Sequence, residues 1–253
     1  MNEASSLVLV DSTYENVTAP CPQCAVRNVY NRESDLRNLR PVVRASVACE
    51  ACKQAFAICG DLINPAHQML LLDCGPLIEG KHYMQAALGI AQAYEVFFSH
   101  YLYVTLIYRP FARDGGDDLE RLGRLKELVY KTIERKTFEP MRQLVLRLIV
   151  EGCRPKTLAE AEAAIASLGA KDSVRRAEVE AVATEPRRTM MLGLFDTTVH
   201  TLRNKVVHKE AYRPTREETR TAYEDTSRIL FGLTEELGLG GTEEHYINGG
   251  DDG

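Results

Sequence analysis

Four cysteines near the N-terminus have the spacing of metal ligands. They form two Cys-x-x-Cys pairs, Cys21 with Cys24 and Cys49 with Cys52. Two residues between thiolates let one tight turn direct both sulfurs at the same ion, and a second such turn completes a tetrahedron. Four thiolates close the coordination shell, so the pattern predicts a structural Zn²⁺ site without a catalytic role. Unbound buried thiols and redox chemistry at a Cys-x-x-Cys pair are the alternatives.

A second set of residues that could do chemistry lies in the segment 203–208, whose sequence is RNKVVH. Histidine titrates near neutral pH, so His208 can accept or donate a proton. Arg203 presents a planar, charged fork that suits phosphate, and Asn204 can donate a hydrogen bond to an oxygen or orient the histidine. These groups fit the attack of an RNA 2′-hydroxyl on its neighbouring phosphate, which requires no divalent metal. The alternative is a helix C-terminus at which the helix dipole favours cations.

The spacing of Arg203 and His208 restricts how the two residues can act together. Five positions of an ideal α-helix turn the side chain through about 140°, so the two would not share one face. Either the helix loosens near Val206, or the acting pair comes from two chains. Glu95 lies close to an apolar helical stripe and could pair with either residue to tune the site. The alternative is that Glu95 only borders the stripe.

The segment 203–208 precedes a helix that begins with the capping-box pattern Thr215-Arg-Glu-Glu218. In this setting the chain resembles the HEPN superfamily. The signature of that family is Arg-x4-6-His, frequently with Asn or another polar residue after the arginine. The match falls on Arg203, Asn204 and His208.

The resemblance implies a fold, an activity and partners. HEPN proteins are helical bundles that often act as RNA-cutting toxins or defence nucleases, and they usually dimerise so that two Arg/His pairs line one cleft. For this chain it implies a metal-independent endoribonuclease of toxin or antiphage-defence type. RNA, a second copy of the chain and an antitoxin or regulatory protein are the implied partners. The cysteine-bearing region would then contact RNA or the regulator.

The remaining sequence predicts a mainly α fold, an antiparallel helical bundle with a small N-terminal β zinc ribbon. Strand-forming residues at 46–48 and 54–58 flank the second cysteine pair. Apolar residues at three- and four-residue steps predict a helix from about 81 that Arg109-Pro110 and Gly115-Gly116 end. The same pattern predicts further helices at about 118–135, 139–150, 157–169, 186–202 and 215–237. The expected organisation is an N-terminal tail at 1–16, a ribbon with its connector at 17–75, a helical domain at 76–238 and a disordered tail at 239–253.

The net charge of −5 over 253 residues argues against a general attraction to nucleic acid, so any anion-binding surface must be local. Basic residues cluster between positions 121 and 156, and the ribbon adds further arginines; solvated faces are the alternative interpretation. The ribbon arginines are Arg27, Arg32, Arg37, Arg40 and Arg44.

Reduced, unpaired cysteines and an N-terminus without signal-peptide character predict a cytoplasmic protein. Polar residues interrupt the apolar segment 88–108, which favours a buried helix over a membrane span.

Two non-enzymatic functions compete with the nuclease hypothesis. The first is a zinc-ribbon and helical adaptor that binds nucleic acid, a nucleotide or a partner protein. In that case Arg203 and His208 would belong to an interface. The second is a purely structural dimer whose helix ends pack together.

Overall fold

The computed structural model describes residues 16–31, 35–36, 44–59, 65–113, 119–168, 173–182, 185–208 and 212–239. The chain divides into two compact units, Met1–Asn64 and Pro65–Gly253. Nearly all of the tails predicted at 1–16 and 239–253 lies outside the described residues.

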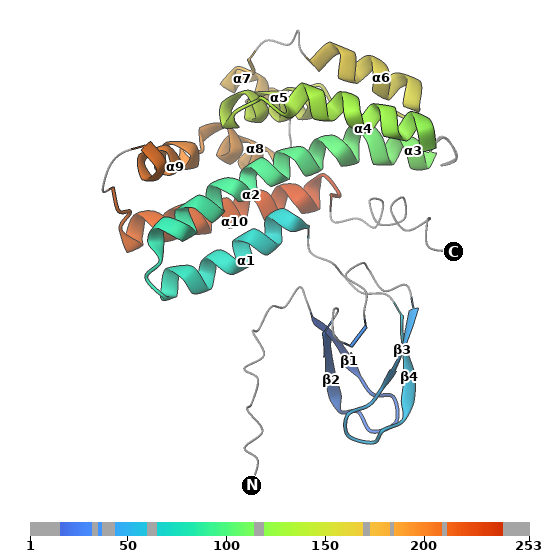
Figure 1. Ribbon diagram of the computed structural model, residues 1–253. Coiled ribbons are helices and arrows are strands. Elements are labelled where there is room, and N and C mark those ends of the chain that lie inside the picture. The colour runs from blue at the N-terminus through green and yellow to red at the C-terminus, as the bar shows by residue number, and fades with distance from the viewer. Residues whose placement is uncertain are drawn as a thin grey trace. The chain divides into compact units, whose positions relative to one another are not determined.

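The described residues of the N-terminal unit form two antiparallel hairpins (Figure 1). Strand β1 (Asn16–Pro20) pairs with β2 (Arg27–Asn31), and β3 (Arg44–Ala48) pairs with β4 (Ala55–Cys59). The second hairpin confirms the strands predicted around the second cysteine pair. The described apolar core of this unit consists of only three buried side chains, those of Ala19, Tyr30 and Ile58. A core of this size is too small to hold the unit together alone.

The second unit is helical, which confirms a mainly α fold. Its helices are α1 (Ala66–Glu79), α2 (Tyr83–Tyr103), α3 (Arg109–Arg113), α4 (Leu119–Ile133), α5 (Phe138–Val150), α6 (Leu158–Ser167), α7 (Arg176–Val182), α8 (Arg187–Asp196), α9 (Val199–His208) and α10 (Arg216–Glu236). A π-helical segment, η1 (Val104–Tyr108), joins α2 to α3. Among the described helices, none has a stretch both apolar and long enough to span a bilayer.

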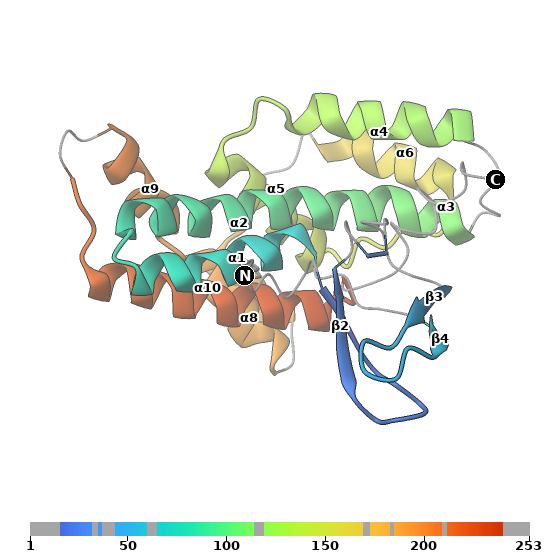
Figure 2. The same cartoon turned by 60° about the horizontal axis from the view of Figure 1, so that its bottom comes forward.

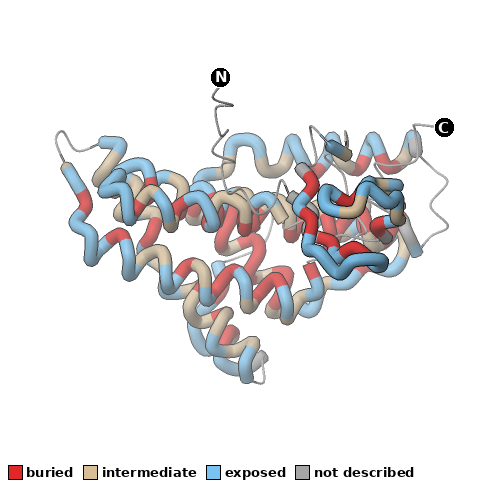
Figure 3. The backbone as a smooth tube through the Cα atoms, turned by 90° about the horizontal axis from the view of Figure 1, so that it is seen from below, coloured by how far each residue is buried: buried red, intermediate tan, exposed pale blue. Residues whose placement is uncertain are grey.

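Helix α2 lies at the centre of this unit and contacts α1, α4, α5, α9 and α10 (Figures 1 and 2). Buried positions follow the inward faces of the helices (Figure 3), and on α2 they include Ile90, Tyr94, Phe97 and Phe98. Helix α1 runs antiparallel to α2 and α10, whereas α2 and α10 run in the same direction. The bundle is therefore only partly antiparallel.

Helix α1 was not predicted from the sequence, because Gly75-Pro76 has the character of a turn. In the structure Pro76 lies inside the last turns of the helix. One face of α1 buries His67, Leu71, Cys74 and Ile78, at steps of four, three and four residues. The helical unit therefore begins at Pro65, well before the predicted boundary at 75/76.

His67 has an unusual environment on that buried face. Its side chain is fully buried, and its Nε2 lies 2.8 Å from the Thr234 hydroxyl oxygen. The ring meets Phe97 edge-on, with the centroids 5.2 Å apart. Burial, with a smaller contribution from His100, lowers the pKa of His67 to about 3. The folded chain therefore holds this histidine neutral.

A pH dependence of stability follows from that lowered pKa. An unfolded histidine titrates near pH 6.5, so the unfolded chain binds the extra proton between about pH 6.5 and pH 3. Stability is therefore complete above pH 6.5 and falls as the pH drops towards 3. We expect wild type to lose about 2 kcal/mol more than His67→Gln between pH 7 and pH 5, measured by urea unfolding. An equal loss of stability in wild type and His67→Gln would contradict the lowered pKa of His67. His82→Gln is the matched control, because it replaces an exposed histidine.

The helix predicted from about 81 continues past the first of its two predicted breaks, Arg109-Pro110, and reaches Arg113. The second predicted break, Gly115-Gly116, lies outside the described residues. The π-helical segment explains how the proline is accommodated. The backbone N–H of Arg109 donates to the Val104 carbonyl, five residues back. The loosened turn lies directly before Pro110, which has no N–H to donate.

The single helix predicted at 186–202 is also wrong, because the chain breaks at Thr197 and Thr198 into α8 and α9. The Thr197 backbone leaves helical geometry with ψ 134°. Its carbonyl accepts a hydrogen bond from Arg142 Nη1 at 2.8 Å, and Arg142 is a nearly buried residue of α5. A contact distant in sequence therefore satisfies the backbone group that the break exposes.

Candidate metal centre and Arg/His site

The two Cys-x-x-Cys turns have the same backbone geometry. Cys21 N–H donates to the Val26 carbonyl and Cys49 N–H to the Gln54 carbonyl, each at 2.9 Å. The residue after each pair has a positive φ, 59° at Ala25 and 61° at Lys53. Each hairpin thus ends in a matching turn that presents its two cysteines.

The four sulfurs of Cys21, Cys24, Cys49 and Cys52 all lie within 4.8 Å of one another. The Cys21 and Cys52 sulfurs are 3.7 Å apart, and those of Cys24 and Cys49 are 3.6 Å apart. A tetrahedral ion with metal–sulfur bonds of about 2.3 Å requires sulfur separations of about 3.8 Å. The cluster that the spacing predicted is therefore assembled, and its dimensions fit a metal ion held by four thiolates.

The electrostatics of the cluster also favour a cation. Backbone N–H groups of Cys52 and Ala51 lower the pKa of the Cys49 thiol to about 6. At Cys24 the Val26 N–H lowers the pKa, but desolvation and the three neighbouring cysteines outweigh it and raise the pKa to about 12. Four thiolates this close repel one another unless a positive ion lies between them.

Asn28 connects the two turns. Its side chain is buried, and its Nδ2 donates to the Val26 carbonyl at 3.0 Å while its Oδ1 accepts from the Glu50 N–H at 2.8 Å. Val26 belongs to the first turn and Glu50 to the second. The amide therefore holds the two pairs of ligands in register, a role that the sequence did not reveal.

We expect Asn28→Ala to weaken metal binding about 10-fold, since losing a partner that orients ligands typically has an effect of this size. Competition for Zn²⁺ with a chromophoric chelator measures the change. Gln54→Ala is the matched control, because Gln54 contributes its backbone carbonyl to the second turn. Equal affinities of the Asn28 variant and wild type would show that the amide has no such role.

The second candidate site lies on α9, in its last two turns. Arg203 is half-buried, while Asn204 and His208 are exposed. Arg203 Nη1 donates to Asn204 Oδ1 at 3.2 Å. The helix is continuous through His208, so it does not loosen at Val206. Arg203 and His208 consequently point in different directions within one chain.

Glu95 does not join this group within one chain. It is exposed on α2, and its backbone carbonyl accepts a hydrogen bond from Ser99 Oγ at 3.1 Å. Within the described ranges, no hydrogen bond or ion pair links the Glu95 carboxylate to Arg203 or His208.

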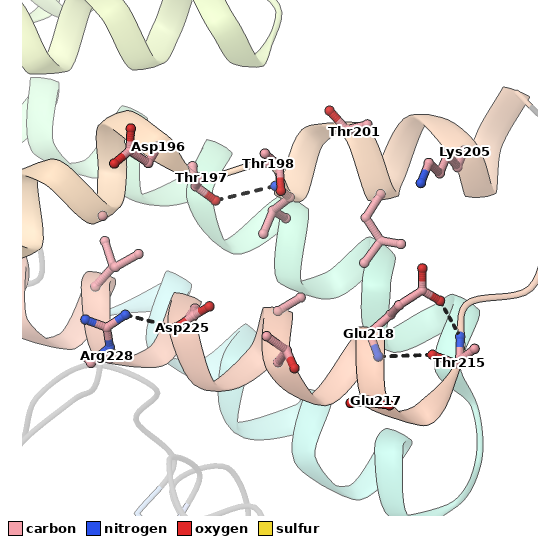
Figure 4. A pocket seen from close by; sticks show the side chains of 16 residues that line it. Asp196, Thr197, Thr198, Thr201, Lys205, Thr215, Glu217, Glu218, Asp225 and Arg228 are labelled. Atoms are coloured by element: carbon pink, nitrogen blue, oxygen red, sulfur yellow. Dashed lines mark hydrogen bonds and ion pairs between the residues drawn. The ribbon is translucent and has the colours of Figure 1, made fainter. Parts of the chain in front are cut away.

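A pocket of about 840 Å³ lies between α10 and the junction of α8 with α9 (Figure 4). Its charged lining combines four carboxylates with two cations. These are Asp196, Glu217, Glu218, Asp225, Lys205 and Arg228. Lys205 belongs to the segment that carries Arg203 and His208, and it projects towards α10 (Figure 4). Because carboxylates outnumber cations in its lining, this pocket would repel a phosphate backbone.

The start of α10 anchors the end of α9. Glu218 and Thr215 form the predicted capping box, with bonds of 2.8 and 3.1 Å. Glu218 also accepts a hydrogen bond from the Tyr212 hydroxyl at 2.7 Å. The Lys205 ammonium lies 5.5 Å from the Tyr212 ring centroid. Glu218 thus connects the cap of α10, through Tyr212, to Lys205 of α9.

Thr215→Ala is expected to destabilise the helical unit by about 1 kcal/mol, because it removes the side chain that caps the Glu218 N–H. Thr215→Ser should retain most of the wild-type stability, since its hydroxyl can form the same bond. Chemical denaturation followed by far-UV circular dichroism makes the comparison. Equal stabilities of the alanine variant and wild type would exclude a structural role for this cap.

Most of the basic residues at 121–156 are already paired. Arg121 pairs with Glu162, Arg147 with Glu178, and Lys131 with Glu127. Arg142 is nearly buried and pairs with Glu139. Most of these basic residues therefore belong to solvated or internal ion pairs. This favours solvated helix faces over a surface that binds a phosphate backbone. Of the arginines predicted to add to this surface from the N-terminal unit, three lie outside the described residues: Arg32, Arg37 and Arg40.

Comparisons with protein-family models, with curated proteins and with solved structures give no match.

Proposed function

We propose that this chain is a HEPN-like, metal-independent endoribonuclease that works as a homodimer, with a structural Zn²⁺ in its N-terminal unit. The observation that carries the proposal is the position of Arg203, Asn204 and His208 in the last turns of α9, ahead of the capped helix α10, with Asn204 and His208 exposed. A toxin or antiphage-defence role in the cytoplasm, regulated by an antitoxin or similar protein, follows from the resemblance.

The proposed reaction is an internal transesterification of RNA. His208 takes the proton from a 2′-hydroxyl, whose oxygen attacks the adjacent phosphorus. Arg203 stabilises the charge that develops on the phosphoryl oxygens, and Asn204 orients the arginine through their shared hydrogen bond. The bond to the 5′-oxygen breaks, and that oxygen takes up a proton. The products are a 2′,3′-cyclic phosphate and a 5′-hydroxyl.

The geometry of α9 supports a site shared between two chains. A regular helix separates Arg203 and His208 by about 140°, so one substrate phosphate is better reached by the arginine of one protomer and the histidine of its partner. Glu95 remains a candidate for tuning this composite site, since it lies exposed on α2, which packs against α9.

Zn²⁺ is the proposed ion in the cysteine cluster. Four sulfur ligands in a tetrahedral arrangement are characteristic of structural zinc, and they leave no position for a reacting water. The N-terminal unit is therefore proposed to recognise RNA or a partner, not to carry out chemistry.

The test is to incubate the zinc-loaded protein with RNA in buffer cleared of free divalent metal by a chelating resin, with no chelator left in solution to remove the structural Zn²⁺. We expect cleavage, products that end in 2′,3′-cyclic phosphate by mass spectrometry, and resistance when the nucleotide at the cleavage point lacks its 2′-hydroxyl. Cleavage that depends on Mg²⁺ and leaves a 5′-phosphate, or no cleavage at all, would rule out this mechanism.

One observation favours the adaptor hypothesis as the second candidate. The 840 Å³ pocket beside α9 is lined by more carboxylates than cations, so it suits a cationic segment of a partner protein better than RNA. RNA binding without cleavage, or capture of a basic peptide that Glu217→Lys abolishes, would support the adaptor.

A further inference from the structure

A second pocket, of about 480 Å³, surrounds the C-terminal end of α10. Four arginines from three separate parts of the chain line it. They are Arg109 and Arg113 of α3, Arg154 from the segment after α5, and Arg187 of α8. We refer to it as the arginine pocket.

Two of these arginines have a structural role. Arg109 Nη2 donates to the carbonyls of Leu237 and Gly238, the first at 3.0 Å. Arg187 Nη2 donates to the Glu236 carbonyl at 2.9 Å. These bonds satisfy carbonyls that have no partner within α10, and the cations oppose the negative end of its dipole. Arg109 and Arg187 are thereby fixed in position.

The other two arginines have no such role. Arg113 and Arg154 are exposed, and no hydrogen bond or ion pair involves either side chain in the part of the chain that the structure describes. The lining also contains two carboxylates, Glu235 and Glu236. Four guanidinium groups against two carboxylates leave an excess positive charge of two, although the whole chain has a net charge of −5.

Two further donors in the lining lack an acceptor. Thr105, from η1, is 4% exposed, and its buried hydroxyl forms no hydrogen bond of good geometry among the described residues, although it lies close enough to the Tyr101 hydroxyl to lower the pKa of that group slightly against the larger effect of burial. Arg187 Nε likewise lacks a hydrogen bond, since the nearest carboxylate oxygen of Glu236 is 3.6 Å away. Unsatisfied buried donors that line a cationic cavity indicate an acceptor-rich ligand. The π-helical setting of Thr105 is also frequent at functional sites.

We propose that the arginine pocket binds a small phosphate-bearing anion. Planar guanidinium groups bind phosphate through paired hydrogen bonds, and the volume of the pocket lies in the range of small-ligand sites. The site is separate from the Arg203/His208 group. About 25 Å of α10 separates Glu218 from Glu235, at 1.5 Å per residue. The proposal does not depend on RNA cleavage.

The test is calorimetric titration of the full chain with inorganic pyrophosphate and, separately, with ADP at constant ionic strength. We expect both to bind, and Arg154→Ala to weaken binding about 10-fold, since one charge-assisted hydrogen bond has roughly this effect. Arg113→Ala should act similarly, and Arg154→Lys should keep part of the affinity. Tighter binding of ADP would show that the pocket also contacts a nucleoside; equal binding would show that the phosphates suffice.

The matched control is Arg135→Ala, which removes the same charge from an exposed position outside the pocket. Failure of both probes to bind at about 1 mM would overturn the proposal, because a pocket with four arginines should then give measurable heat. Equal weakening by Arg135→Ala and Arg154→Ala would also overturn it, since only the general charge of the protein would then matter. Arg113 and Arg154 are exposed and form no hydrogen bond or ion pair among the described residues, so their variants should fold.

Discussion

Replacing His208 by alanine is expected to slow RNA cleavage by about 10²- to 10⁴-fold, the usual contribution of a general acid or base. The measurement is the single-turnover rate on a short RNA with zinc-loaded protein, in buffer cleared of free divalent metal by a chelating resin. The variant should fold normally, because the His208 side chain is exposed at the end of α9. His82→Gln serves as the control, since it changes an exposed histidine far from α9 in sequence.

Mixing two inactive variants distinguishes a shared site from a site within one chain. If each active pair consists of Arg203 from one protomer and His208 from its partner, a dimer of Arg203→Ala and His208→Ala chains retains one intact pair. Random exchange makes about half of the dimers mixed, so about a quarter of the wild-type rate should return. No recovery, with exchange verified by mass labelling, would place each pair within one chain. Equal rates for wild type and His208→Ala would exclude the nuclease proposal.

Removal of the metal is expected to unfold the N-terminal unit and leave the helical unit folded. Metal binding in small four-ligand domains contributes about 10 kcal/mol or more, whereas three buried apolar side chains contribute only a few kcal/mol. Cys49→Ala should have the same effect, since Cys49 is fully buried and its backbone N–H and carbonyl both bond within the second turn. Two-dimensional NMR should show the signals of residues 16–59 collapse while those of α2 and α10 persist.

Cys74→Ala provides the matched cysteine variant. Cys74 is buried in the helical unit, where its thiol donates to the Ala86 carbonyl. Cys74→Ala should retain one Zn²⁺ per chain and a folded N-terminal unit. An N-terminal unit that stays folded after the metal is removed, or a zinc content unchanged in Cys49→Ala, would refute a structural zinc site.

The features that could be predicted from the sequence are those fixed by neighbours in the chain. Each cysteine pair lies within one tight turn, and Thr215 with Glu218 forms its box inside one helical turn. Such geometry requires no knowledge of the rest of the fold. The assembly of two distant pairs into one cluster was also predictable, because four thiolates at this spacing have few other stable arrangements.

The features that could not be predicted depend on distant contacts. The break between α8 and α9 is stabilised by Arg142, which lies in α5. Helix α1 contains a Gly-Pro pair, and it is held by its buried face against α2 and α10. The acidic character of the pocket beside α9 arises because α8 and α10 bring Asp196 and Asp225 into one lining. No local pattern contains that information.

The π-helical segment Val104–Tyr108 links the core of the helical unit to the arginine pocket. Such a segment is equivalent to one inserted residue in an α-helix, and one residue turns everything that follows by about 100°. Arg109 and Arg113 therefore face the end of α10 only because this extra residue rotates α3 relative to α2. The length of the π-helical segment, more than its composition, thus decides which face of the bundle carries the positive charge. Deleting one residue from this segment would move that charge to another face, although every arginine would still be present in the sequence.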